Sequence, residues 1–153
     1  MMLSSSDIRV LAFAHTLELT TRDTYKVVTS RKSLSDDERA LLEQFHANHV
    51  AYEQTLNGLL SKNAATKRDD AIYTSFSAKL SEAQNIWLAL LEIENTMIAS
   101  HTKAIEKIES AQVAALVASM ITVEARHAAI LAGQATVYLS TALDNNATAL
   151  AAS

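Results

Sequence analysis

The feature that most constrains this chain is its near-total lack of residues that interrupt helices. Proline is absent from the 153 residues, and glycine occurs only at Gly58 and Gly133. An average protein contains about 5% proline and about 7% glycine. The glycine- and proline-marked turns that separate the strands of β-proteins are therefore missing, while good helix formers such as alanine and leucine are plentiful. The sequence predicts an all-α protein with one domain.

Charge and cysteine content exclude several classes of function. The net charge is −4, which leaves no basic surface for a nucleic-acid backbone, so we expect no nucleic-acid partner. Cysteine is absent, which excludes disulfides, thiolate metal ligands and cysteine nucleophiles. No run of about 18 uncharged apolar residues predicts a membrane span, and no signal peptide is visible. As written, the sequence predicts a cytoplasmic protein, and export of a longer precursor stays open.

Hydrophobic residues recur every three or four positions in four long segments, which is typical of amphipathic helices. The expected helices cover residues 6–29, 35–62, 81–109 and 110–141. Ser35 and Glu38 have the spacing of a capping box at the start of the second helix, and Ser81 and Gln84 have it at the start of the third. Helices of about 24 to 30 residues are about 36 to 45 Å long, and four of them predict a four-helix bundle.

The predicted connections differ in length. Residues 30–34 and the junction near residues 109–110 are short, so they predict antiparallel neighbours, whereas residues 61–80 are long enough to climb the whole bundle. A short helical turn is expected inside this long segment, around Ile72, Tyr73 and Phe76. We therefore expect two antiparallel hairpins joined by one long crossover within residues 1–141. The small and polar residues 142–153 are expected to form a frayed tail.

Each predicted helix carries glutamate or histidine on its apolar stripe, near its midpoint. In an antiparallel bundle the midpoints lie at one height, so these side chains are expected to form one polar layer in the core. Buried charges are costly unless they are paired or bound to metal, and iron and manganese take oxygen and nitrogen ligands. A Glu-x-x-His pair also places both ligands on one helix face. The candidate metal ligands are Glu18, His46, His49, Glu94, Glu124 and His127, with Glu53 ranked behind them.

Four stretches resemble the ferritin-like superfamily, and more narrowly the bacterial ferritin-like domain proteins that consist of a single bundle. They are HTLELTTRDTY around Glu18, FHANHV around His49, LEIENTMIASH around Glu94, and VEARHAAIL around Glu124 and His127. The resemblance implies a di-iron carboxylate bundle in which Glu18 and Glu94 are single-helix carboxylates. It also implies that Glu124 bridges the metals, with His127 and His49 as the histidine ligands.

One position departs from that resemblance. Where the family pattern has a glutamate three residues before His49, this chain has His46. A carboxylate can bridge two metal ions, whereas a neutral imidazole normally ligates one metal through one nitrogen. Two ions bridged by Glu124 and solvent, a single ion, and a vestigial empty site all stay open. Glu53, on the same side of the second helix, is a candidate for compensating the missing carboxylate.

Other polar and aromatic residues near the layer are expected to play supporting roles. His101 lies two turns beyond Glu94 on the same stripe and is expected beside the metals or along a channel, not as a ligand. His15, one turn before Glu18, is expected beside the site or at the edge of the stripe. Tyr25 is expected to pack in the core, although a tyrosine near a redox metal can also transfer an electron or donate a hydrogen bond.

Two functions are consistent with these observations. The first is a metal-binding protein whose two iron ions, with manganese or a single ion as alternatives, react with oxygen or peroxide, as in an oxidoreductase or a ferroxidase. The second is a non-catalytic structural or interaction module with a vestigial or single-metal site, whose polar layer is held by internal Glu–His hydrogen bonds. A homodimer is expected from base rates alone. The sequence does not identify a substrate, the physiological metal or a redox partner.

Overall fold

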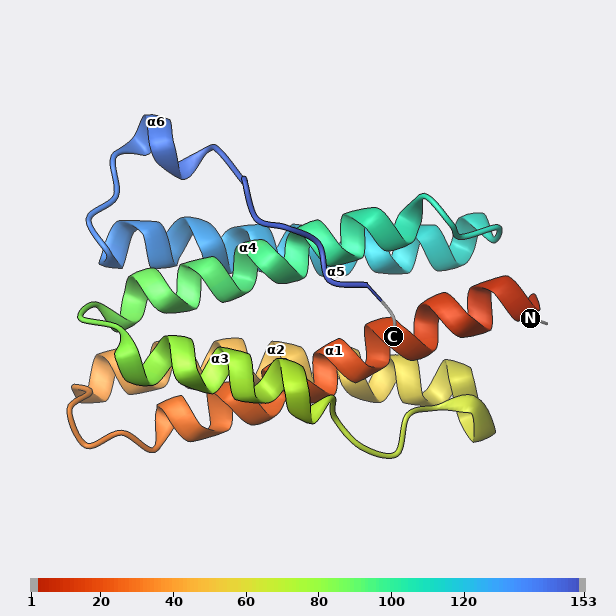
Figure 1. Cartoon of the computed structure of the whole chain (residues 1–153), viewed down its shortest axis with the longest axis horizontal. Coiled ribbons are helices and arrows are strands. Elements are labelled where there is room, and N and C mark those ends of the chain that lie inside the picture. Colours follow the sequence, from red (N-terminus) through yellow and green to blue (C-terminus); the bar gives the residue numbers. More distant parts are fainter. Residues whose placement is uncertain (1–2, 152–153) are drawn as a thin grey trace. The chain divides into compact units, whose positions relative to one another are not determined.

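The computed structural model describes residues 3–151, which form helices and irregular segments and no strand, so the prediction of an all-α fold is confirmed. The helices are α1 (Ser5–Thr29), α2 (Asp36–Leu60), the short 3-10 helix η1 (Ser61–Asn63), α3 (Asp70–Glu82), α4 (Ile86–Ile105), α5 (Ala111–Gln134) and α6 (Leu139–Ala142) (Figure 1). The chain divides into two compact units. The N-terminal unit comprises residues 11–77, and the C-terminal unit comprises residues 3–10 and 78–151 among those described.

In the N-terminal unit, α1 and α2 form an antiparallel hairpin. The side chain of His15 in the first half of α1 contacts Glu53 in the second half of α2, and Tyr25 in the second half of α1 contacts Phe45 in the first half of α2. Partner numbers therefore fall along α2 as they rise along α1. The predicted stripe of α1 is buried throughout, namely Leu11, Ala14, Glu18, Thr21, Tyr25 and Val28. This burial fixes which face of α1 meets its neighbours.

The turn between α1 and α2 is closed by side chains that satisfy the helix ends. The predicted capping box is present: Ser35 Oγ accepts from the Glu38 N–H, and the Glu38 carboxylate accepts from the Ser35 N–H at 2.8 Å. The Arg39 guanidinium donates to the carbonyls of Thr29 and Arg31, where α1 ends. Both sets of contacts satisfy backbone groups that have no partner within their own helix.

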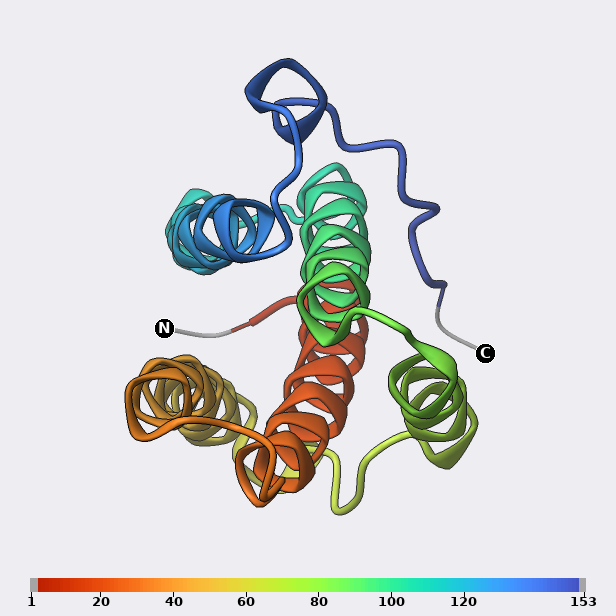
Figure 2. The same cartoon turned by 90° about the vertical axis from the view of Figure 1, so that its left-hand side faces the viewer.

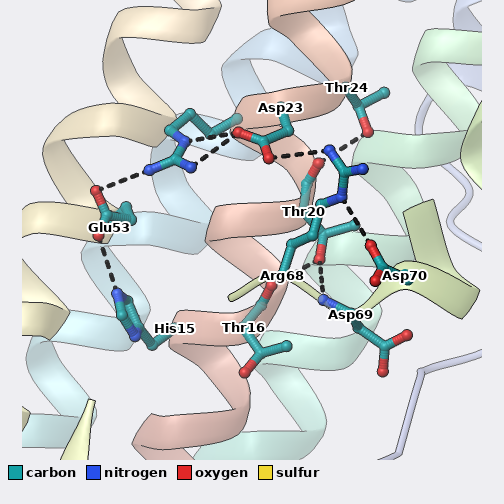
Figure 3. Close-up of polar contacts among 10 residues, drawn as sticks. His15, Thr16, Thr20, Asp23, Thr24, Glu53, Arg68, Asp69 and Asp70 are labelled. Atoms are coloured by element: carbon teal, nitrogen blue, oxygen red, sulfur yellow. Dashed lines mark hydrogen bonds and ion pairs between the residues drawn. The ribbon is translucent and has the colours of Figure 1, made fainter. Parts of the chain in front are cut away.

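The start of the long connection is fastened to α1 by two backbone N–H groups. Ala65 N–H donates to His15 Nδ1 at 3.1 Å. Asp69 N–H donates to Thr20 Oγ1 at 3.1 Å (Figure 3). Residues 61–69 are thus held against the hairpin although only η1 within them is helical.

Charged side chains reinforce the same contact. Arg68 donates to Asp23 and to Asp70, each at 3.1 Å (Figure 3). Its guanidinium lies 3.4 Å from the centre of the Tyr73 ring. The ion pairs with Asp23 and Asp70 raise the pKa of Arg68, so it is charged at every physiological pH. Arg68 therefore joins α1 to the first turn of α3.

The helical turn expected around Ile72 is a full helix, α3, and it changes the predicted start of the next helix. Ser81 lies inside α3, where its hydroxyl donates to the Ala78 carbonyl, so the predicted cap at Ser81 is wrong. The N-cap of α4 is Asn85, whose side-chain oxygen accepts from the Trp87 and Leu88 N–H groups. The third predicted helix is therefore shorter at this end by about one turn.

In the C-terminal unit, α4 and α5 form the second antiparallel hairpin (Figures 1 and 2). The link between them is capped from the start of the chain, because the buried Asp7 carboxylate accepts from the Glu109 and Ser110 N–H groups at 2.8 and 3.2 Å. Ser110 in turn caps α5 by accepting from the Val113 N–H. The short link predicted near residues 109–110 is confirmed, and α4 ends slightly before it at Ile105.

The predicted extension of the fourth helix to residue 141 is wrong. α5 ends at Gln134 because Thr136 adopts a left-handed conformation with φ of 58°. Val137 N–H donates to the Ala132 carbonyl, which is the six-to-one hydrogen bond of a Schellman motif. Tyr138 is 83% exposed and does not continue the buried stripe.

Residues after α6 follow α4 without forming a helix of their own (Figure 2). Asn145 Nδ2 donates to the Asn95 carbonyl at 3.0 Å, and the Leu150 N–H donates to Ser100 Oγ at 2.9 Å. In the described part of the chain, α5 is the one helix that is long and apolar enough to cross a membrane by length and composition. It also carries buried polar side chains, as described next.

Candidate metal centre

The N-terminal unit holds one buried carboxylate–imidazole pair. Glu18 on α1 and His49 on α2 are both fully buried, and the Glu18 Oε2 to His49 Nδ1 distance is 2.8 Å. The ring of Tyr25 stacks on the His49 imidazole, with centroids 5.2 Å apart and planes inclined by 24°. The hairpin therefore fixes both the position of the histidine nitrogen and the plane of its ring.

The C-terminal unit holds two such pairs across the α4–α5 hairpin. Glu94 Oε1 lies 3.2 Å from His127 Nδ1. In the second pair, His101 Nδ1 lies nearly equidistant from both Glu124 carboxylate oxygens, at 3.0 Å from one and 3.1 Å from the other. Glu94, Glu124 and His101 are fully buried and His127 is 2% exposed. In each pair, the carboxylate oxygen and the imidazole nitrogen lie close enough together to bind one ion.

The donor set fits divalent metal ions. Two ligand atoms bound to one ion at about 2.1 Å and at right angles are about 3.0 Å apart, and the three pairs have separations of 2.8 to 3.2 Å. The same separation suits a hydrogen bond, so each pair is also satisfied without an ion. Carboxylate oxygen and imidazole nitrogen are the donors that iron and manganese take in proteins. No sulfur donor competes, because the chain has no cysteine.

His46, one of the six predicted ligands, lies one turn before His49 on α2 and is half-buried. Desolvation lowers its pKa, and the neighbouring His49 and Arg22 lower it further, so the imidazole is neutral near pH 7 and has a free nitrogen lone pair. Within residues 3–151, His46 forms no pair with any of the three buried glutamates. Its role as a ligand stays a prediction.

Glu53 is engaged away from the Glu18–His49 pair. It is 13% exposed, accepts from His15 Nε2 at 3.0 Å and from Arg22 at 3.4 Å (Figure 3). Because His15 Nδ1 accepts the Ala65 N–H, its proton lies on Nε2 and points to Glu53. His15 is thus a buried part of the connection's anchor, and the ligand role considered for Glu53 has no support from these contacts.

His101 is expected beside the metals and not as a ligand, because it lies two turns from Glu94 along the same stripe. The structure places its Nδ1 at hydrogen-bonding distance from Glu124 on the facing helix. The available signal was its place on the same buried stripe as Glu94, seven residues later. Whether His101 also binds a metal stays a question for the proposals below.

Comparison with known proteins identifies the fold. The family model described as ferritin-like domain matches residues 6–136, which include all six predicted ligands and His101. No match was found among curated proteins or solved structures. The matched region covers both helical hairpins and the long connection between them. The chain therefore belongs to the ferritin-like domain family.

Proposed function

We propose that this protein binds two iron ions, or iron with manganese, and uses them to reduce oxygen or peroxide. The observation that carries the proposal is that the N-terminal unit encloses one glutamate–histidine pair and the C-terminal unit encloses two, each at the separation of two ligands on one metal ion. The ligands proposed are Glu18, His49, Glu94, Glu124 and His127, with one further histidine, His46 or His101, as the sixth donor.

The glutamates and the histidines of the proposed site have different roles. Three glutamates bring three negative charges, which offset most of the four positive charges of two divalent ions in a dry core. The histidines supply neutral nitrogen donors that set geometry and redox potential. Reduction of one hydrogen peroxide to two waters takes two electrons and two protons, and a pair of bound ferrous ions would supply the two electrons. The five ligands other than the sixth donor are all buried, which would exclude bulk water from the site.

Metal analysis tests this proposal directly. Protein expressed in iron-rich and in manganese-rich medium should contain close to two ions per chain, and Glu124→Ala or His127→Ala should lose them. Glu92→Ala is the matched control, because Glu92 is an exposed carboxylate on α4 that pairs with Lys79. Wild-type protein that stays metal-free after anaerobic incubation with ferrous iron would overturn the proposal.

A second candidate function is a non-catalytic helical module with a vestigial or single-metal site. The observation that favours it is that every one of the three glutamates already has an imidazole partner inside its own unit. For such a module, Glu18→Gln, Glu94→Gln and Glu124→Gln should keep or raise the melting temperature and leave the metal content unchanged. For the metal protein, the same changes should lower the metal content.

A further inference from the structure

We propose that His101, and not His46, is the sixth metal-binding donor, and that it ligates the same ion as Glu124. This inference rests on the proposed metal-binding function and specifies which residues carry it. It assigns the α4–α5 hairpin four ligands of its own: Glu94, His101, Glu124 and His127. Position 46 of α2 has no carboxylate, and His101 on α4 supplies a donor atom in its place.

The first argument is the geometry of the His101–Glu124 pair. His101 Nδ1 is nearly equidistant from both Glu124 oxygens, at 3.0 and 3.1 Å. The nitrogen therefore lies close to both carboxylate oxygens, so an ion bound by Glu124 would be within reach of Nδ1. Without an ion, the same geometry provides a hydrogen bond to one of the two oxygens.

The second argument is the equivalence of the two pairs in the hairpin. Glu94 with His127 and Glu124 with His101 each join α4 to α5, once with the glutamate on α4 and once with it on α5. Each pair presents one carboxylate and one Nδ1 atom, and all four side chains are almost or fully buried. If Glu94 and His127 ligate a metal, Glu124 and His101 offer the same donors to a second one.

The third argument is the contrast with His46. His46 is half-buried, whereas His101 is fully buried. A metal ligand in a dry core must be held where water does not compete for the ion, and its ring must be fixed by its surroundings. His101 meets both conditions, since α4 and α5 enclose it and Glu124 fixes its Nδ1.

The test compares His101→Asn with His46→Asn. Asparagine places an N–H donor close to the position of histidine Nδ1, so it keeps a hydrogen bond to Glu124 but offers no imidazole nitrogen to a metal. Anaerobic titration with Co²⁺ should show two bound ions in the wild type and in His46→Asn. His101→Asn should bind one of the two ions at least about tenfold more weakly, with fewer nitrogen donors in the Co²⁺ spectrum.

Other outcomes overturn the assignment. Loss of an ion in His46→Asn, or two tight ions in His101→Asn, would show that His101 is not the sixth donor. If His101→Asn does not fold by circular dichroism, hyperfine-shifted imidazole N–H signals of Co²⁺-loaded protein decide: His46→Asn must keep every signal of the wild type. Wild-type protein that binds no Co²⁺ and no ferrous iron contradicts the proposed function itself, which separates that failure from this one.

Discussion

Tyr25 positions His49 by covering one face of its imidazole ring. The two rings are stacked, and Phe45 contacts the Tyr25 ring edge-on, with the ring centroids 6.2 Å apart. A ligand whose ring is held in one plane loses less entropy when it binds a metal. Tyr25→Leu should therefore weaken metal binding by about tenfold, as other changes around metal ligands do. Isothermal titration with Mn²⁺ measures the effect.

The control for this prediction is Tyr25→Phe, which keeps the aromatic face. Affinity in Tyr25→Phe should stay close to that of the wild type, because stacking and not the hydroxyl holds the imidazole. An equal loss of affinity in both variants would assign the effect to the tyrosine hydroxyl instead.

At the scale of single residues, the sequence predicts which side chains are buried better than which side chains contact one another. Glu18, His49, Glu94, Glu124 and His127 are all buried as expected, because the three-and-four spacing of apolar residues fixes the inward face of a helix. The contacts between side chains of two facing helices depend on the stagger of the helices and on side-chain length. The periodicity of a single helix predicts neither. For this reason the periodicity of α4 does not predict that His101 contacts Glu124.

The capping box at the start of α2 gives this helix a pH-dependent end. The backbone N–H and the hydroxyl of Ser35 bond the Glu38 carboxylate and lower its pKa from the ordinary value of 4.5. A lowered pKa in the folded protein means that the carboxylate stabilises the fold above the unfolded-state value, and that this contribution disappears as pH falls through the folded-state value.

Glu38→Gln should accordingly be less stable than the wild type at pH 7 and equally stable well below pH 4. Urea unfolding at several pH values measures the difference. Ser35→Ala should lower stability by about 1 kcal/mol at pH 7, because the Glu38 N–H loses its acceptor. A constant difference between Glu38→Gln and wild type at all pH values would contradict this account of the cap.

The end of α5 contains a residue that is poorly suited to its backbone. Thr136 is β-branched and has φ of 58°, a conformation in which glycine is free of strain. Thr136→Gly should raise the free energy of unfolding by about 1 kcal/mol. Thr136→Ala is the control: it shortens the side chain but keeps a Cβ atom, so it should gain clearly less in the same thermal unfolding experiment.

The helix ends show why element boundaries were harder to predict than elements. The predicted cap of α4, Ser81, and its actual cap, Asn85, lie four residues apart, and which residue begins α4 depends on how far α3 continues. The end of α5 has threonine where a Schellman motif usually has glycine, so no stop signal is visible in the sequence. The prediction from periodicity therefore extends the helix too far. Only the capping box at Ser35, with both halves present, was unambiguous.

At the scale of the whole molecule, Thr20 is one of the residues that hold the long connection against α1. Thr20, Thr16 and Thr24 each donate to the carbonyl one turn earlier, but only Thr20 also accepts a backbone N–H from the connection, that of Asp69 (Figure 3). Thr20→Val keeps the shape and leaves this N–H without an acceptor. It should cost about 1 to 2 kcal/mol.

Thr24→Val is the matched control for this change, since Thr24 is equally buried and has only the bond within its helix. Hydrogen exchange of the Asp69 amide should speed up in Thr20→Val and stay slow in Thr24→Val. Equal effects of both substitutions on stability and exchange would show that the anchor of the connection lies elsewhere.

The overall architecture followed from the sequence because breakers are so scarce. With no proline and only two glycines, the polar residues after Leu60 were the one long interruption of helical periodicity, and they form the connection as expected. The length of α3 inside it was missed, since a short amphipathic segment next to polar residues does not reveal whether a turn or a helix forms.

The pairing of each glutamate with a histidine of its own hairpin bears on the order of events during synthesis. Each hairpin matches its core carboxylates with imidazoles that are already present, so neither waits for an ion to complete its interior. We expect the chain to leave the ribosome and fold metal-free, and to be loaded afterwards. If the protein binds iron as proposed, iron-starved cells would then hold it folded and metal-free, and it would take up the metal when iron returns.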